Sequence, residues 1–148
     1  MSDRQALVDE VLALRPASTA LLVVDMQRGF VEPGEPMEVP TARETALPRI
    51  RELVVRKRWY DAFAGTPLDG ALRAPGVDTL VITGTMTDIC VLATVVGAFN
   101  REYRITVVED AVATLWPEIH RVTLDIIGRA YGRVVSTKEV ADEMRNHL

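Results

Sequence analysis

The sequence predicts an α/β domain in which a parallel sheet of five to six strands carries helices on both faces, in three αβα layers of the Rossmann-like kind. Short continuous apolar runs, typical of strands buried on both faces, alternate with segments of helical periodicity. The chain has 148 residues, of which 48% are hydrophobic and 26% charged, as in one ordinary globular domain. We therefore assign residues 1–148 to a single domain.

The first half of the chain predicts two helices and two strands. Each predicted helix shows apolar residues at helical spacing, and each predicted strand is a short apolar run. In order they are a helix over 7–14, a strand over 20–24, a helix over 41–53 and a strand over 53–56. Arg15-Pro16 ends the first helix, and a polar loop bearing Pro and Gly separates the first strand from the second helix.

The second half predicts a turn and short helix over 62–72, strands over 79–83, 104–108 and 134–135, and helices over 88–99, 117–130 and 138–147. The helix over 88–99 is apolar nearly all round, which favours a central position. The helix over 117–130 has Pro in its first turn and is closed by Gly132. Its spacing predicts that four residues face inward: Ile119, Val122, Ile126 and Ala130.

Charge and cysteine content narrow the function classes. The net charge is −4 with no basic block, which argues against nucleic acid or an anionic membrane as a partner. A single cysteine cannot form an internal disulfide and suits a reducing compartment, and the first residues do not resemble a signal peptide. We expect a cytoplasmic protein.

Three reactive residues lie at or just beyond predicted strand ends, where ligands bind in such folds: Asp25, Lys57 and Cys90. Taken singly, Asp25 could cap a turn, Lys57 could be a surface amine and Cys90 a small buried hydrophobe. A carboxylate, an ammonium and a thiol at three strand ends of one sheet are harder to explain as three independent structural roles. Thr87 or Asp88 is suited to cap the following helix, which would place Cys90 in a first turn that favours a lowered thiol pKa.

Together these groups could catalyse acyl transfer. Asp25 would accept the thiol proton and return it to the leaving amine, while Lys57 favours the thiolate and keeps Asp25 ionised. Cys90 would attack a carbonyl, and the backbone N–H groups of Met86 and Cys90 could receive the oxyanion. Neither His120 nor His147 lies near a predicted strand end, so a Cys–His pair is not expected.

Three stretches resemble the isochorismatase-like cysteine hydrolases, which include nicotinamidase, N-carbamoylsarcosine amidase and ureidoacrylate amidase. They are Ala20–Phe30 around Asp25, Val55–Phe63 around Lys57 and Thr83–Val91 around Cys90. The resemblance implies that Asp25, Lys57 and Cys90 form a catalytic triad and that the Thr85–Met86 peptide is cis. It also implies a substrate-packing aromatic at Phe30 and a place near the triad for Gln27. Trp59, Tyr60 and Phe63 could line the pocket, or could serve ordinary core or interface packing.

The chain departs from the family pattern in two places. Members of the family usually carry a further strand and helix before the lysine strand, whereas here Leu53 runs directly into Val54. Either that unit is lost or the sequence omits it. In nicotinamidases the stretch carries Asp and His metal ligands, so we predict no metal and no cofactor here. The second departure is Asp61, where serine is usual; it could compete for Lys57, and we interpret it as a change of specificity.

These observations favour a metal-independent hydrolase that cleaves a C–N bond of a small amide or ureido compound. One alternative is vinyl-ether hydrolysis of the isochorismatase kind, in which the aspartate donates a proton and no thiol is needed. Another is a non-catalytic member that binds a metabolite or serves as an oligomer building block. A reduced sheet with apolar helices also predicts a homo-oligomer, a dimer or larger.

Overall fold

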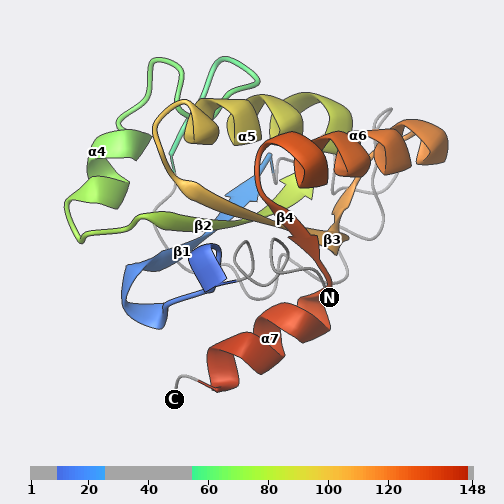
Figure 1. Cartoon of the computed structure of the whole chain (residues 1–148). Helices are drawn as coiled ribbons and strands as arrows, with labels where there is room; N and C mark the ends of the chain where they lie inside the picture. The colour runs from blue at the N-terminus through green and yellow to red at the C-terminus, as the bar shows by residue number, and fades with distance from the viewer. Residues whose placement is uncertain (1–9, 26–54, 147–148) are drawn as a thin grey trace.

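The sheet consists of four parallel strands in the described part of the chain, residues 10–25 and 55–146 of a computed structural model (Figure 1). The strands are β1 (Thr19–Val24), β2 (Thr79–Thr85), β3 (Arg104–Ala113) and β4 (Arg133–Val135). They lie side by side in chain order, β1-β2-β3-β4, and every neighbouring pair is parallel. This α/β architecture confirms the predicted fold class.

The helices alternate with the strands along the chain and cover both faces of the sheet. In chain order they are the 3-10 turn η1 (Pro16–Ser18), α4 (Leu68–Arg73), the π-helical turn η3 (Thr87–Val91), α5 (Leu92–Phe99), α6 (Pro117–Ala130) and α7 (Thr137–Arg145). Figure 1 shows α5 and α6 over one face and α7 on the other. No helix in the described ranges has the length and hydropathy needed to cross a bilayer.

Alternate residues of the central strands supply two separate cores. On the α5–α6 side, Leu80 and Ile82 of β2 pack with Val95 of α5 and Ile127 of α6, all fully buried. On the α7 side, Val81 joins a smaller cluster that also contains Leu14 and Val108, against Val140 and Met144 of α7. The period of two along β2 thus divides its side chains between the two layers.

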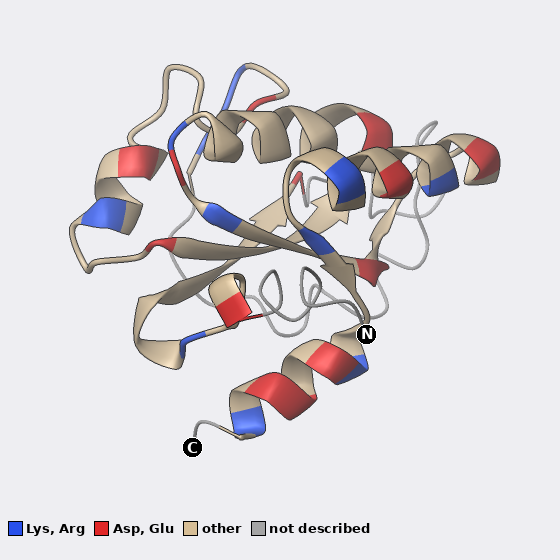
Figure 2. Cartoon of the chain, in the orientation of Figure 1, with Lys and Arg blue, Asp and Glu red and all other residues tan. Residues whose placement is uncertain are grey.

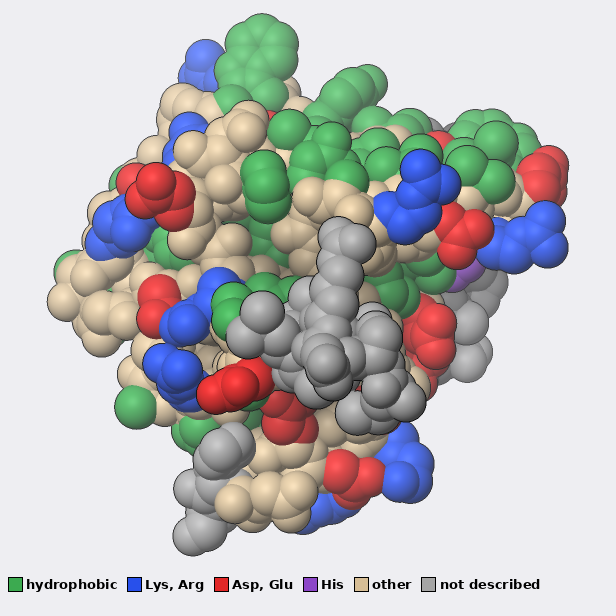
Figure 3. All heavy atoms as spheres, viewed as in Figure 1, with side chains coloured by type: hydrophobic (Ala, Val, Ile, Leu, Met, Phe, Trp, Pro, Cys, Tyr) green, Lys and Arg blue, Asp and Glu red, His purple; other side chains and the backbone are tan. Residues whose placement is uncertain are grey.

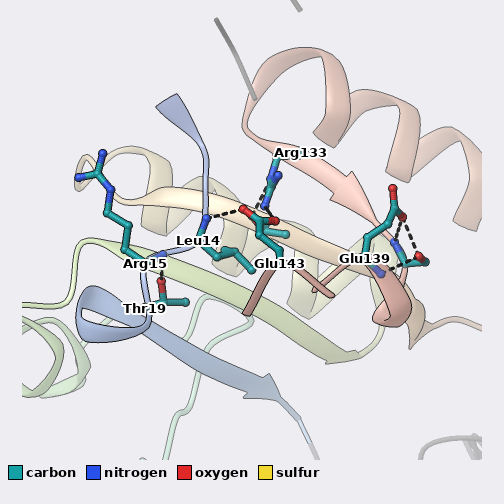
Figure 4. A network of polar contacts seen from close by, with 8 residues as sticks. Leu14, Arg15, Thr19, Arg133, Glu139 and Glu143 are labelled. Atoms are coloured by element: carbon teal, nitrogen blue, oxygen red, sulfur yellow. Dashed lines mark hydrogen bonds and ion pairs between the residues drawn. The ribbon is translucent and has the colours of Figure 1, made fainter. Parts of the chain in front are cut away.

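Polar contacts fix α7 to the sheet, as Figure 4 shows. Both carboxylate oxygens of Glu143 are used: Oε1 accepts from the Leu14 N–H at 2.6 Å and Oε2 from Nη2 of Arg133 at 2.6 Å. At the start of α7, Ser136 and Glu139 form a reciprocal capping box. The capping box stabilises the first turn of α7 itself, and Glu143 ties the end of the helix to Leu14 and to β4.

Most predicted elements are present, with shifted ends. The helix over 117–130 has the predicted bounds, whereas β2 continues two residues beyond 83 and β3 five residues beyond 108. Of the predicted strand over 53–56, only Val55 and Arg56 are described, and neither is in a strand. The predicted helix over 41–53 and the junction between Leu53 and Val54 lie outside the described residues, so the missing unit stays a prediction.

The predicted inward face of α6 is wrong. Thr123 and Ile127 face the sheet, being 4% and 0% exposed, whereas Ile119, Val122 and Ile126 are 43%, 50% and 42% exposed. Ala130 is exposed as well. Gly132 closes the helix as predicted, since its N–H donates to the Ile127 carbonyl oxygen at 3.1 Å. It also permits close packing, because a β-carbon there would lie 2.3 Å from the carbonyl oxygen of Ile105 on β3. The helix is rotated so that its longest apolar row faces away from the core.

Candidate active site

Asp25 lies directly after β1, beside the end of β2. Val24 pairs with Gly84, and the Thr85 hydroxyl donates a 3.0 Å hydrogen bond to the Asp25 carbonyl oxygen. Gly84 has φ +118°, and a β-carbon there would lie 2.0 Å from the carbonyl oxygen of Val24. Only glycine permits this approach, which brings the residue after β1 next to the end of β2.

Lys57 reaches the Asp25 carboxylate from a segment without regular secondary structure. Its Nζ lies 2.8 Å from Asp25 Oδ2, and the two side chains are only 15% and 13% exposed. The same Nζ donates to the Trp59 carbonyl oxygen at 3.1 Å. Because both charged groups are largely removed from water, the pair is screened far less than a surface ion pair.

Cys90 lies in η3, immediately after β2. The Thr85–Met86 peptide is cis, as the family resemblance implies. Met86 is the N-cap of η3, with no side-chain cap, and its carbonyl oxygen accepts from the N–H groups of Ile89 and Val91 at 3.1 and 3.0 Å. The predicted cap by Thr87 or Asp88 is therefore wrong. These two side chains bond instead to residues outside the turn.

The predicted lowering of the Cys90 pKa is also wrong. The side chain is buried, and this burial, together with a hydrogen bond to the Asp25 carboxylate and the charge of Asp25, raises the pKa of the thiol to about 11. The positive charge of Lys57 and a hydrogen bond from the Met86 backbone lower the same pKa by smaller amounts. At neutral pH the resting residue is a thiol beside a carboxylate that can accept its proton.

The structure brings the three predicted catalytic residues into one cluster, with Asp25 in contact with Lys57 and acting directly on the Cys90 thiol. The arrangement can transfer a proton from sulfur to carboxylate while a neighbouring ammonium balances the negative charge.

The other predicted site residues are distributed differently. Gln27 and Phe30 lie outside the described residues. Trp59 and Tyr60 are each 66% exposed, whereas Phe63 is buried in the core with its ring 5.7 Å from that of Tyr103. Phe63 thus occupies the core position that the sequence left as an alternative.

Asp61 accepts a 2.8 Å hydrogen bond from the Phe63 N–H through Oδ1 and lies against Gly97 of α5. Within the described ranges its carboxylate has no ion pair with Lys57. Asp61, which stands where serine is usual, therefore stabilises the local turn. It does not form the contact with Lys57 that its charge predicts.

His120 is a residue of the site that sequence reasoning missed. Its Nδ1 lies 3.0 Å from the hydroxyl oxygen of Thr87, and Thr87 is fully buried in the turn that carries Cys90. Thr114 supports the same turn, since its hydroxyl donates to Asp88 Oδ1 at 2.5 Å. Thr114 comes just after β3, so a sequence prediction with the correct end of that strand would have identified it by its position at a strand end. His120 had no such signal, because it lies on a helix face.

His120 also lines a groove of about 640 Å³ between α6 and residues of β3 and β4, together with Glu109 and Asp125. Asp25, Lys57 and Cys90 do not line this groove. Among the described residues, no three His, Cys, Asp or Glu side chains are placed to hold a metal ion together.

Comparison with known proteins relates this geometry to a family. A model of the isochorismatase domain matches residues 40–139, which include Lys57 and Cys90. Ureidoacrylate amidohydrolase RutB of Methylobacterium radiotolerans is 43% identical over 92 residues, which are 62% of this chain and 36% of that protein. Maleamate amidohydrolase of Pseudomonas putida is 33% identical over 103 residues, 70% of this chain and 48% of that protein. The chain thus spans between about a third and a half of the length of these curated relatives.

Solved structures have the same fold. A nicotinamidase from Staphylococcus aureus superposes with a TM-score of 0.72 at 26% identity, covering 81% of this chain and 99% of that chain. A cysteine hydrolase from Pseudomonas syringae gives a TM-score of 0.81 at 23% identity, covering 92% and 96% respectively. The second likeness concerns the fold alone.

Proposed function

The chain belongs to the isochorismatase family, as its three motifs indicate, and from this membership we propose that it is a cysteine hydrolase acting on the C–N bond of a small amide or ureido compound. One observation carries the proposal: the Asp25 carboxylate contacts Lys57 at 2.8 Å and also acts on the Cys90 thiol. The relatives named as ureidoacrylate and maleamate amidohydrolases support the same class of bond.

The reaction begins with Cys90 as a neutral thiol. Its sulfur attacks the substrate carbonyl carbon while the thiol proton passes to Asp25, so that thiolate forms only as the new C–S bond forms. The resulting oxyanion is received by the backbone N–H groups of Met86 and Cys90. Lys57 balances the charge of Asp25 before the proton arrives and stabilises the pair electrostatically.

Collapse of the tetrahedral intermediate breaks the C–N bond. Asp25 returns its proton to the leaving nitrogen, which departs as ammonia or an amine and leaves a thioester on Cys90. Asp25 then takes a proton from water, the hydroxide adds to the thioester, and the carboxylic or carbamic acid leaves as the C–S bond breaks. The sulfur regains its proton from Asp25, which restores the resting state.

We further propose that this chemistry needs no metal. Support comes from the sequence, whose two histidines, His120 and His147, form no cluster with metal-ligand spacing. A cytosolic location is proposed for the same protein, since a nucleophilic thiol must stay reduced to act.

The test is ammonia release from ureidoacrylate, maleamate and nicotinamide, measured with the wild type, Cys90→Ala and Asp25→Asn. We expect the wild type to hydrolyse at least one of these substrates in the presence of a chelator, and both variants to be inactive. Mass spectrometry at short times should detect a thioester adduct on Cys90 of the wild type. Turnover of an amide that survives Cys90→Ala would contradict the mechanism. Hydrolysis of a vinyl ether by Cys90→Ala would favour the isochorismatase reaction, and binding without turnover of any substrate would favour the non-catalytic reading.

A further inference from the structure

The outward face of α6 carries a row of large apolar side chains. Ile119, Val122 and Ile126 are spaced three and four residues apart, so they form one line along the helix. They are 43%, 50% and 42% exposed. Figure 3 shows hydrophobic side chains gathered over the part of the surface that α5 and α6 form. A contiguous apolar surface of this kind marks an interaction site more often than a solvated face.

Further apolar residues lie at both ends of this row. Leu115 and Trp116 directly precede the helix and are 42% and 48% exposed. At the other end Phe99 of α5 is 46% exposed, and its ring packs edge-on against Tyr131, which follows α6, at 5.4 Å between centroids. We call the six exposed residues the α6 patch: Phe99, Leu115, Trp116, Ile119, Val122 and Ile126.

The exposed area of the α6 patch is on the order of 500 Å², counting about half of each side chain. A standard protein interface buries about 800 Å² on each partner, of which the apolar centre is roughly this size and the rim is polar. The patch is thus large enough to be the centre of a stable interface.

The charges beside the row show which partner fits. Glu118 and Arg129 are both exposed, and they lie at opposite ends of the helix. Eleven residues of α-helix correspond to a rotation of about 20° beyond whole turns and a rise of about 16 Å, so both side chains lie along the same edge of the row. A second α6 that packs antiparallel about a two-fold axis between Thr123 and Leu124 therefore places Glu118 of each copy opposite Arg129 of the other.

The same symmetry also fits the apolar row. With the axis between Thr123 and Leu124, Ile126 of one copy falls between Ile119 and Val122 of the other along the helix direction. A parallel pair about an axis along the helices would instead place the two Glu118 side chains at the same level on opposite edges, so that neither faces Arg129. Opposite charges at the two ends of one edge make that edge self-complementary, which is the property of an isologous interface.

We propose that the α6 patch is the centre of a two-fold symmetric interface between two copies of this chain. The helices meet antiparallel along Ile119, Val122 and Ile126, and two Glu118–Arg129 pairs close the rim. The interface includes none of the catalytic residues, so the oligomeric state and the proposed hydrolysis are separate measurements, and either can fail alone.

Sedimentation velocity over a concentration series tests the apolar centre. The wild type is expected to be a dimer, and Val122→Glu to raise the dimer dissociation constant at least a hundredfold. Val11→Glu is the matched control, since Val11 is 52% exposed and lies outside the patch. It should leave the dissociation constant unchanged. Circular dichroism and thermal unfolding of each variant establish that it is folded before its mass is compared.

A charge exchange tests the orientation. Glu118→Arg and Arg129→Glu each convert two attractive pairs into two repulsive ones, so each should weaken the dimer three- to tenfold, and the double exchange should restore the wild-type constant. A monomeric wild type at high micromolar concentration overturns the proposal, as does a dimer that Val122→Glu leaves intact or weakens no more than Val11→Glu. A double exchange that is as weak as the single variants overturns the antiparallel arrangement.

Discussion

Replacing Asp25 with asparagine is expected to lower the pKa of the Cys90 thiol while it abolishes hydrolysis. Three causes raise that pKa to about 11: burial, the hydrogen bond to the Asp25 carboxylate and the negative charge of Asp25. Asp25→Asn removes the charge and the carboxylate acceptor, and it leaves the lowering effect of Lys57 in place. The substitution thus makes sulfur easier to ionise and removes the group that accepts its proton in the reaction.

The magnitude follows from the position of the pKa. With a value of about 11, roughly one Cys90 in a thousand is ionised at pH 8, and each unit of decrease raises that fraction about tenfold. A less basic thiolate is also a weaker nucleophile, which offsets about threefold of the gain per unit. Alkylation at pH 8 should therefore accelerate about threefold for each unit by which the pKa falls.

The assay is a titration of thiolate absorbance in the ultraviolet, with Cys90→Ser subtracted as the control for tyrosine ionisation. Because the chain has one cysteine, the difference belongs to Cys90 alone. Lys57→Ala should move the midpoint upward, since it removes a group that lowers the pKa. A midpoint in Asp25→Asn at or above that of the wild type would refute this account of the site, and so would a downward shift in Lys57→Ala.

Three further substitutions test the contacts that hold the site and α7 in place. Gly84→Ala should destabilise the fold by about 3 kcal/mol or more in guanidinium unfolding, because its β-carbon would lie 2.0 Å from a carbonyl oxygen of β1. The control is Gly128→Ala on α6, where a β-carbon has room, and it should stabilise the fold by up to about 1 kcal/mol. Equal effects of the two substitutions would contradict the close approach at Gly84. His120→Ala should lower kcat about tenfold with little change in KM, because the Thr87 hydroxyl loses its hydrogen-bond partner. His120→Asn should recover part of this loss. An unchanged kcat in His120→Ala would show that the contact does not position η3. Glu143→Ala should lower the free energy of unfolding in urea by about 2 kcal/mol, since the ion pair with Arg133 and the acceptor for the Leu14 N–H are both lost. A change under about 0.5 kcal/mol would mean that the packing of α7 does not depend on this carboxylate.

The strand-end rule predicted the cluster of reactive groups well. Asp25 and Cys90 follow neighbouring parallel strands, and the carboxyl ends of such strands meet at one edge of the sheet regardless of how many strands the sheet has. Lys57 was predicted to follow a strand that the described residues do not show, yet its Nζ contacts Asp25. Its long, flexible side chain makes its place in the cluster insensitive to that error.

Two predictions failed because a local pattern was weighed without its surroundings. In α6, Ile119, Val122 and Ile126 form the more regular apolar row, but Ile127 and Thr123 are the residues that the sheet buries. Periodicity identifies the apolar row of a helix and cannot tell whether a core or another surface will cover it.

The second failure concerns Cys90. A helix start contributes up to about 1 kcal/mol in favour of a negative charge at an exposed position, which is less than one pKa unit. Burial and the adjacent carboxylate raise the pKa from its ordinary value of 9.0 to about 11, so they outweigh the helix start. Neither influence can be read from the sequence, because both depend on how the segments containing Asp25 and Cys90 come together.

The close approach of β1 and β2 at Gly84 has a consequence for how the chain tolerates changes in length. The spacing between acid and sulfur is set by two adjacent strands, whereas the amine comes from a stretch outside the sheet. Residues inserted or deleted upstream of Lys57 leave that spacing intact as long as its ammonium still reaches Asp25. A shortened connection between the first strand and the lysine is thus compatible with an unaltered acid–thiol geometry.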